Sequence, residues 1–480
     1  MKKLYLLMGL ALLTFCAGCG SSGSGIVTGF IPTGGFSNAS LSGQYVYQIQ
    51  GVDFSVNASG AAYREAGVFT ANGAGLITSV ADDFSEAGSV GSTTSTGAYV
   101  IRTDGTGSLT FTNALGTVNF EVTLVSASKV YLMEIDSPLN AGGLAELQNA
   151  AAIAAAPSGT FVFREHDLNT LQSVGSVGAF AISGGAVSAG SEDVNRAGVL
   201  TSLTFTGSFN PPNTANGRGT ATFTDSSPAT YNFFYYIVDA NNIRFLEATP
   251  GITGVGRAEL QNGTPALSGS YAFGSGGDTL TSVIGVNMAG RFTASGGTIS
   301  AGARDSVQDG ASVANISFTG TYTQAASGRA LLNLSNAANN IFVVWMVSPS
   351  RGFFVVNDPN TIQEGTLDLQ QSGTFTNSTT NGQYALIMDG VDTGGLKDRV
   401  GTLLWDGSGK LTLNEVSNAA GVINGPVVLS GTYAVSGNGR TTGSISSISS
   451  NLVFYLVSST DAYVIQNDTN VEVNGTISKQ

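Results

Sequence analysis

Thiols and imidazoles are almost absent from this sequence of 480 residues. Its two cysteines, Cys16 and Cys19, lie near the start of the chain, and His166 is its one histidine. The sequence after Cys19 therefore provides no disulfide, no thiolate nucleophile and no cysteine-ligated zinc. No Gly-x-Ser-x-Gly motif in a strand-to-helix context accompanies His166. We interpret His166 as a surface or turn residue, and the sequence predicts no catalytic site, metal site or cofactor.

Charged residues are also scarce. They make up 11% of the chain, whereas 42% of its residues are hydrophobic. The formal net charge is −13, and no basic stripe is present to release counterions, which excludes nucleic acid as an expected partner. The apolar share is large enough for several folded cores. We expect polar faces rich in hydroxyl and amide groups.

The start of the chain has the pattern of an export signal. Met1-Lys2-Lys3 supplies positive charge, and an apolar run follows from Leu4 to Phe15. This run is too short to span a bilayer and has the length of a signal-peptide core. Residues 1–18 are therefore predicted to be a signal peptide.

The segment Cys16-Ala17-Gly18-Cys19 resembles the lipobox of bacterial lipoproteins. The resemblance implies cleavage before Cys19 and acylation of that residue, so that membrane lipid becomes a partner. The Gly/Ser-rich residues 19–38 would then form a flexible tether. Gly20 after the cysteine implies the outer membrane if the cell is Gram-negative. The alternative is an ordinary secretory signal.

One short pattern occurs four times: a glycine, one residue, and then an aromatic residue followed by alternating apolar positions. Subtraction of the residue numbers gives intervals of 116, 110 and 113 between successive copies, which is the size of a small domain. Later landmarks keep the same order in each copy, including a closing Gly-x-x-x-x-Gln strand that reads as degraded in the last copy. The sequence predicts four repeat domains at 39–149, 157–262, 265–371 and 378–480. The four copies begin with Gly43-Gln44-Tyr45, Gly159-Thr160-Phe161, Gly269-Ser270-Tyr271 and Gly382-Gln383-Tyr384.

Each repeat reads as an antiparallel all-β meander. Alternating apolar residues and Asn-Gly or Asp-Gly turns predict eight strands in the first copy, at 43–51, 62–71, 75–84, 95–103, 107–113, 117–126, 129–136 and 142–149. A small up-and-down barrel is the preferred fold, and a β-sandwich is the alternative. The opening strand loosely resembles that of lipocalin and avidin-like barrels. That resemblance supplies no ligand-binding residues.

Two strands are apolar on both of their faces, which predicts that they lie at a contact between domains or under a loop. They are Tyr231 to Val238 and Ile341 to Val347, and such strands are covered on both faces. The one segment read as helix-like is Gln148 to Ala156, which Pro157 ends.

Acidic residues offer candidate sites, for which a structural role is preferred. Paired carboxylates are required for glycoside hydrolysis, and the matching positions of the third and fourth copies hold Val356 with Asp368 and Gln466 with Ser478. This loss indicates strand-face residues. The candidates are Glu134 with Asp136 and Glu146 in the first copy, and Glu247 with Glu259 in the second. The possible calcium ligands Asp82-Asp83, Asp305 with Asp309, and Asn357-Asp358 lack the EF-hand pattern and are interpreted as turn residues.

These observations favour a non-enzymatic, membrane-anchored surface lipoprotein. Its tandem domains would act as a structural, adhesion or binding array, with a surface glycan or protein as ligand. One alternative is a carrier that encloses a small apolar ligand, with Tyr45, Tyr271 and Tyr384 lining its barrels. Another is carbohydrate binding or hydrolysis in a groove between domains.

Overall fold

The described residues form thirty-two β-strands, β1 to β32, and three short 3₁₀ helices. The structure is a computed structural model that describes residues 35–56, 60–114, 116–136, 138–169, 172–263, 265–280, 285–335, 341–392 and 395–480. The predicted signal peptide, Cys19 and most of the predicted tether lie outside these residues. Within them, no helix has both the length and the apolar character needed to cross a bilayer.

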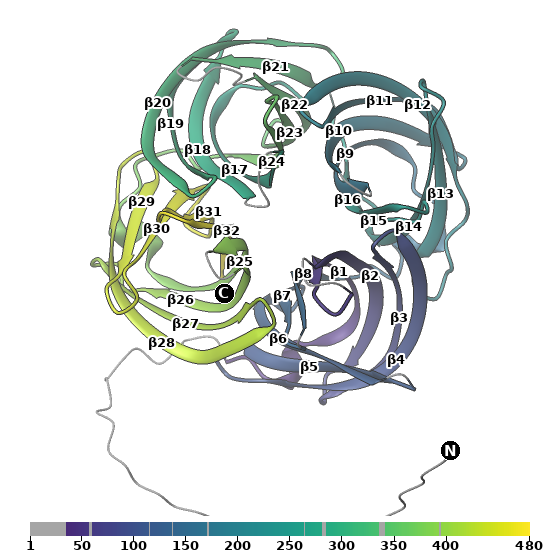
Figure 1. Ribbon diagram of the computed structural model, residues 1–480, viewed down its shortest axis with the longest axis horizontal. Helices are drawn as coiled ribbons and strands as arrows, with labels where there is room; N and C mark the ends of the chain where they lie inside the picture. Colours follow the sequence, from purple (N-terminus) through teal and green to yellow (C-terminus); the bar gives the residue numbers. More distant parts are fainter. Residues whose placement is uncertain are drawn as a thin grey trace, which may run out of the picture. The chain divides into compact units, whose positions relative to one another are not determined.

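The strands form four closed antiparallel barrels of eight strands each (Figure 1). In each barrel every strand pairs with the next one in sequence, and the eighth strand pairs with the first. This confirms the up-and-down barrel and excludes the sandwich for these domains. Barrel 1 contains β1 (Ser42–Asp53), β2 (Ala61–Asn72), β3 (Leu76–Glu86), β4 (Ser89–Ile101), β5 (Thr106–Asn113), β6 (Gly116–Ser126), β7 (Lys129–Glu134) and β8 (Leu139–Leu147).

The other three barrels repeat this order. Barrel 2 contains β9 (Gly159–Asn169), β10 (Gln172–Ser183), β11 (Ala186–Arg196), β12 (Val199–Phe209), β13 (Arg218–Asp225), β14 (Thr230–Asp239), β15 (Asn242–Glu247) and β16 (Ile252–Leu260). Barrel 3 contains β17 (Gly269–Thr279), β18 (Gly285–Ser295), β19 (Thr298–Gln308), β20 (Ala311–Gln324), β21 (Arg329–Leu334), β22 (Ile341–Ser348), β23 (Arg351–Asn357) and β24 (Thr361–Leu369). Barrel 4 contains β25 (Gly382–Asp392), β26 (Gly395–Trp405), β27 (Lys410–Ala419), β28 (Val422–Val435), β29 (Arg440–Ile445), β30 (Ser450–Leu456), β31 (Asp461–Gln466) and β32 (Val471–Lys479).

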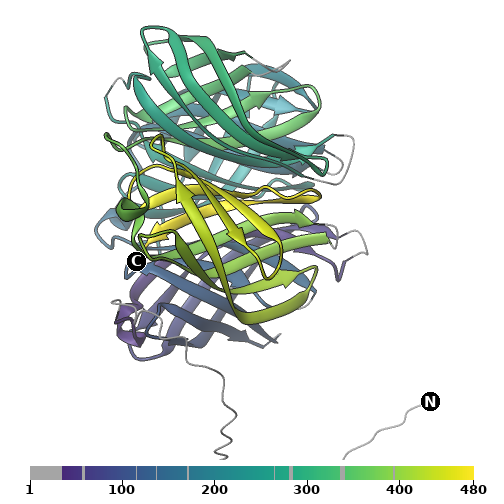
Figure 2. The ribbon, with the colours of Figure 1, turned by 90° about the vertical axis from the view of Figure 1, so that its left-hand side faces the viewer.

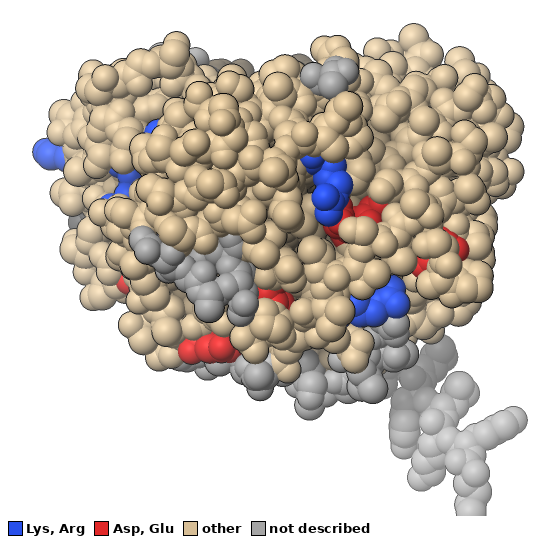
Figure 3. Space-filling model, turned by 90° about the horizontal axis from the view of Figure 1, so that it is seen from above, with Lys and Arg blue, Asp and Glu red and all other residues tan. Residues whose placement is uncertain are grey.

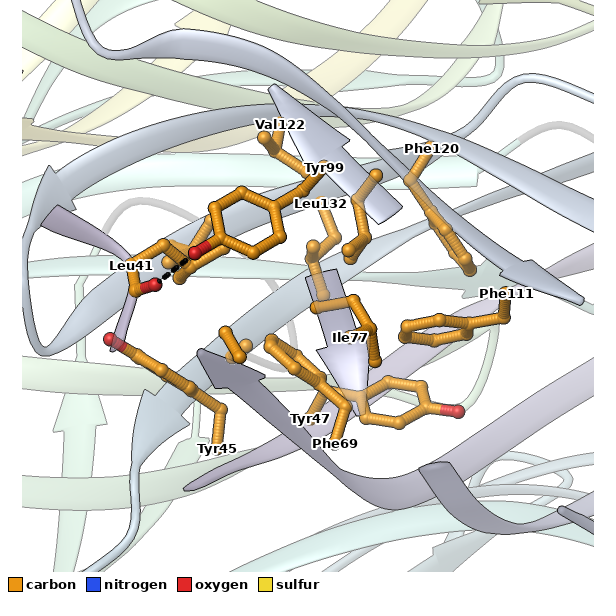
Figure 4. Close-up of a cluster of buried hydrophobic side chains, with 14 of the residues drawn as sticks. Leu41, Tyr45, Tyr47, Phe69, Ile77, Tyr99, Phe111, Phe120, Val122 and Leu132 are labelled. Carbon is orange, nitrogen blue, oxygen red and sulfur yellow. Dashed lines mark hydrogen bonds between the residues drawn. The ribbon is translucent and has the colours of Figure 1, made fainter. Parts of the chain in front are cut away.

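Aromatic side chains pack the interior of barrel 1. In Figure 4 they point toward one another from several strands, and Tyr45 stacks on Phe69 with ring centroids 5.2 Å apart. The Tyr99 hydroxyl donates to the Leu41 carbonyl at 2.7 Å at one end of this core. Tyr271 and Tyr384 occupy the cores of barrels 3 and 4 in the same way. The three tyrosines therefore lie inside their barrels, as expected, where they are packed against other side chains.

The segment from Gln148 to Ala156 is not a regular helix, because its polar groups bind the next barrel. The Asn149 amide donates to the Val238 carbonyl at 2.8 Å, and only Ala152–Ala154 form the short 3₁₀ helix η2. Ile153 of this turn enters the core of barrel 2. Two further 3₁₀ helices are present: η1 (Asn38–Ser40) precedes barrel 1, and η3 (Asn377–Thr380) precedes barrel 4. The segment is therefore also not alone in having helical turns.

The four barrels contact one another in a closed ring, seen face-on in Figure 1 and from the side in Figure 2. We call each contact between neighbouring barrels a joint. Separate apolar clusters fill joints 1–2, 2–3, 3–4 and 4–1. Tyr236 and Val238 belong to the first cluster, and Val343, Trp345 and Val347 belong to the second. The two strands predicted to be covered on both faces therefore lie at domain contacts, which is one of the two environments expected for them.

Candidate functional site

A glutamine at the end of each barrel fastens that barrel to the next one. The Nε2 group of Gln148 donates to the Asn216 carbonyl at 3.0 Å and to the Ile237 carbonyl at 2.5 Å. The equivalent bonds of Gln261, Gln370 and Gln480 also reach two backbone carbonyls in the following barrel. For Gln480 that barrel is barrel 1, so this bond closes the ring.

Gln480 was missed in the sequence analysis because the last closing strand was read as degraded. Gln148, Gln261 and Gln370 each follow a glycine by five residues, and Gln480 follows Gly475 at the same distance. This spacing is the signal that identifies it.

A buried aspartate, an arginine and an aromatic residue join barrels at three of the four joints. At joint 2–3, Asp193 accepts bonds from Arg329 Nε at 2.7 Å, Arg329 Nη2 at 2.6 Å and Trp345 Nε1 at 2.8 Å. Such bidentate pairs are strong and directional. The equivalent groups are Asp83 with Arg218 and Tyr236 at joint 1–2, and Asp305 with Arg440 and Tyr455 at joint 3–4.

The interpretation of Asp82-Asp83 and Asp305 as turn residues is therefore wrong. They lie within β3 and β19, and Asp83 and Asp305 are fully buried. Burial, followed by the Asp83 charge, raises the pKa of Tyr236 well above its usual value, so the phenol keeps the proton that it donates. Asp358 does lie in a turn, where it accepts a bond from the Asn360 amide at 2.8 Å.

Joint 4–1 is built differently. In barrel 1, Gly67 pairs with Asp82, and Asp83 is the next residue of that strand. In barrel 4 the equivalent glycine, Gly401, pairs with Glu415, so Val416 occupies the position of Asp83. By the same comparison, Thr106 replaces the arginine and Thr123 replaces the aromatic residue. Val416 packs in an apolar cluster that includes residues of β6, β7, β25 and β26. This joint therefore has no ion pair at the position of the other three.

Glu134 does not meet Glu146, and Glu247 does not meet Glu259, because the members of each pair face opposite sides of the barrel wall. Glu134 and Glu247 point inward at one end of barrels 1 and 2, as does every second residue before them on the same strands. Glu146 points outward and pairs with Arg244 of barrel 2. Asp136 accepts a bond from Asn119 Nδ2 at 2.7 Å.

The outward acids belong to the joints. Glu259 lies 2.8 Å from Arg351 Nε of barrel 3, and Asp368 accepts a bond from Tyr463 of barrel 4 at 2.5 Å. Burial acts to raise the pKa of Glu259, but the adjacent guanidinium groups of Arg351, Arg257 and Arg244 outweigh it and lower this pKa to about 2. The equivalent Ser478 lies 3.0 Å from the Tyr131 hydroxyl of barrel 1.

A central cavity of about 840 Å³ lies where the first and last strands of the four barrels meet. These strands, among them β1, β16, β24 and β25, lie nearest the middle of the ring in Figure 1. Charge gathers here, whereas the face shown in Figure 3 is mostly uncharged. Six of the 19 Lys and Arg residues line this cavity: Arg64, Lys129, Arg164, Arg244, Arg257 and Arg351.

His166 lines the central cavity, so its interpretation as a surface or turn residue is wrong. It lies in β9, with its Nδ1 atom 2.9 Å from Glu364 Oε2 and its Nε2 atom 3.3 Å from Asp278 Oδ2, both in barrel 3. Burial acts to lower the pKa of His166, but Glu364 and Asp278 raise it to about 10. His166 is therefore an imidazolium held between two carboxylates.

Two nearly buried polar groups of the cavity wall have unused hydrogen-bonding capacity. Arg64 Nε and Asp398 Oδ2 have no hydrogen-bond partner among the described residues, and each residue is 6% exposed. Gln50, Asn287 and other amides line the same wall. The cavity therefore offers donors and acceptors to a polar ligand.

A second, smaller cavity of about 70 Å³ lies at one end of barrel 2. Oxygen atoms of Glu165, Asp167 and Glu247 converge there and lie within 4.8 Å of one another. Burial, followed by the charge of Asp167, raises the pKa of Glu247 to about 8. Burial alone raises the pKa of Asp167 to about 7, against the lowering effect of His166, Arg64 and Arg196. The sequence analysis did not single out Glu165 or Asp167 as candidate site residues. Their alternation along β9 places both inside the barrel, opposite to His166.

No protein-family model matches the chain, and no curated protein matches it. Among solved structures, the chain is similar to intact Ap-TbpB with its N and C lobes, at 10% identity over 92% of this chain and 95% of that one, with a TM-score of 0.20. It is also similar to a double mutant of the vaccine antigen Transferrin Binding Protein B from Haemophilus parasuis Hp5. That match has 10% identity over 74% of this chain and 83% of the other, with a TM-score of 0.18.

Proposed function

We propose that this chain is a non-enzymatic, lipid-anchored binding protein of the bacterial cell envelope, and that it binds a glycan in the central cavity. The cavity carries this proposal. Its volume of about 840 Å³ lies in the range of ligand sites, which is roughly 300–1,000 Å³. Amides, carboxylates and guanidinium groups suit the paired hydroxyls of a sugar.

The packed barrel interiors argue against the alternative of an apolar carrier. Tyr45, Tyr271 and Tyr384 are at most 1% exposed and contact other core side chains. The cavity at the end of barrel 2 holds about 70 Å³ and is lined by several charged groups. An apolar ligand needs a larger and less polar space.

The joints favour a rigid binding scaffold over a string of independent adhesion domains. Each barrel contributes strands to the cavity wall, and glutamine bonds and apolar clusters hold every barrel to two others. The cavity is thus preformed, which limits the entropy lost on binding.

Glycan binding is tested with the purified mature chain on a glycan array, followed by calorimetric titration of each glycan that binds. Gln50→Ala removes an exposed amide from the cavity wall and is expected to weaken binding about 3- to 10-fold, the effect of one lost hydrogen bond. Gln172→Ala is the matched control, because Gln172 is also exposed and lies outside the lining residues. Absence of glycan binding, equal effects of both substitutions, or hydrolysis of the bound glycan would contradict the proposal.

The anchor is tested separately at Cys19. Acyl chains on this residue would hold the protein at a membrane, so Cys19→Ser is expected to release it into the soluble fraction. Mass spectrometry of the N-terminal peptide checks the modification directly. An unmodified Cys19 in the mature protein would overturn this part of the proposal and leave the glycan experiment unaffected.

A further inference from the structure

We propose that the end of barrel 2 binds one calcium-sized divalent cation through Glu165, Asp167 and Glu247. The three residues come from two strands that are distant in sequence, β9 and β15. All three side chains project into the barrel, where they border the cavity of about 70 Å³. This site is distinct from the central cavity, which lies outside the barrel walls.

The spacing of the oxygen atoms fits a single ion. One atom from each carboxylate lies within 4.8 Å of the other two. An ion that binds oxygen at about 2.4 Å can bridge atoms up to about 4.8 Å apart, and calcium prefers distances of about 2.3–2.6 Å. Magnesium requires shorter distances of about 2.0–2.1 Å and a stricter octahedron. Oxygen atoms within this limit can share one ion of the size of calcium.

Glu247 supplies an independent reason for a ligand. Its side chain is fully buried, and its Oε1 atom accepts a bond from the Thr249 amide at 2.8 Å. Its Oε2 atom has no hydrogen-bond partner among the described residues, although it borders the cavity. A buried, unpaired carboxylate oxygen is costly unless a proton or a cation satisfies it.

The charges around the cavity also favour a cation. The lining contains two guanidinium groups, and both have other contacts: Arg164 lies 3.4 Å from Glu364 of barrel 3, and Arg196 donates to the Tyr231 hydroxyl at 3.2 Å. These two positive charges do not balance the acids. The acids that line the cavity are Glu165, Asp167, Glu192, Asp225 and Glu247.

The equivalent position in barrel 1 provides a matched control. Glu134 ends β7 as Glu247 ends β15, and it is also buried. Its Oε2 atom also has no hydrogen-bond partner among the described residues, so it differs from Glu247 in its neighbours. Its acidic neighbour Glu65 is already satisfied, because the hydroxyls of Tyr47 and Tyr63 donate to its two oxygen atoms. Glu134→Gln should therefore leave calcium binding unchanged.

The experiment is calorimetric titration of the chelator-treated full chain with calcium chloride, together with thermal unfolding at low and high calcium. One ion per chain and a rise of several degrees in the unfolding midpoint are expected. Glu247→Gln should weaken binding at least tenfold and abolish the rise, while the midpoint without calcium is retained. Asp167→Asn gives the same test if Glu247→Gln fails to fold. No binding by the wild-type chain, binding that survives both substitutions, or an equal loss in Glu134→Gln would overturn the proposal.

Discussion

His166 lies between Glu364 and Asp278, two carboxylates that belong to another barrel. In the unfolded chain these groups are about 200 and 112 residues away along the sequence, so the interaction exists only when the barrels have assembled. Because the folded state binds the imidazolium proton more tightly, stabilisation by His166 is complete below the unfolded pKa of 6.5. It is lost as pH rises towards the folded pKa of about 10.

Substitution of His166 tests this linkage. His166→Gln is expected to reduce the free energy of unfolding by about 3 kcal/mol at pH 6, because it leaves two carboxylates without their cation. The difference from the wild type should shrink as pH is raised to 9.5. Urea unfolding of both proteins at the two pH values measures it. A difference that stays constant, or grows with pH, would show that the ion pair does not act in this way.

At the scale of the strand, one element serves two cores. Phe233, Tyr235 and Ile237 of β14 fill barrel 2, whereas Tyr236 and Val238 of the same strand fill joint 1–2. Alternate residues of a strand point to opposite faces, so such a strand must be apolar at both parities. The printed sequence shows this pattern without any structure, which is why the domain contacts could be predicted.

The polar parts of the joints could not be predicted in the same way. Asp193 and Arg329 are 136 residues apart, and each lies in a segment that local patterns explain adequately. Arg329 follows a turn glycine, and Asp193 alternates with its neighbours on a strand. Only the contact between barrels shows that the two groups pair. The same holds for Glu165 and Glu247, which barrel closure brings together.

The Asp193 pair is expected to be important for stability. Asp193→Ala should lower the free energy of unfolding by about 3 kcal/mol, because it leaves the Arg329 guanidinium and the Trp345 N–H at the joint without an acceptor. Asp358→Ala is the control, since the Asp358 carboxylate accepts a turn bond from the Asn360 amide and its loss should cost about 1 kcal/mol or less. Chemical denaturation gives both values. Equal losses would mean that the joint pair adds nothing beyond a turn bond.

At the scale of the ring, the four joints are not equivalent. Joints 1–2, 2–3 and 3–4 combine a chain connection with a buried aspartate–arginine pair, and joint 4–1 has neither. Its contacts include an apolar cluster, the Gln480 bonds, the Ser478–Tyr131 pair and Asn418, whose Nδ2 donates to the Glu134 carbonyl at 3.1 Å and the Leu139 carbonyl at 2.9 Å. Local opening starts where the fewest interactions must break.

Hydrogen exchange should therefore reveal joint 4–1 as the first to open. Amides of β6, β7, β26 and β27 near this joint are expected to exchange faster than those of the corresponding strands at joint 2–3. Gln480→Ala should widen the difference, whereas Gln261→Ala should raise exchange at joint 2–3 instead. Faster exchange at joint 2–3 in the unmodified protein would contradict this order.

The bonds of Gln480 have a topological consequence. They give barrel 4 the same relation to barrel 1 that each earlier barrel has to its successor, so the sequence of barrels reads as a cycle. A Cβ atom placed on Gly105 would meet both Gln480 and Phe36, which puts the two extremities of the described chain beside one turn. A circularly permuted gene that fuses these extremities and begins at any barrel boundary would thus encode the same assembly.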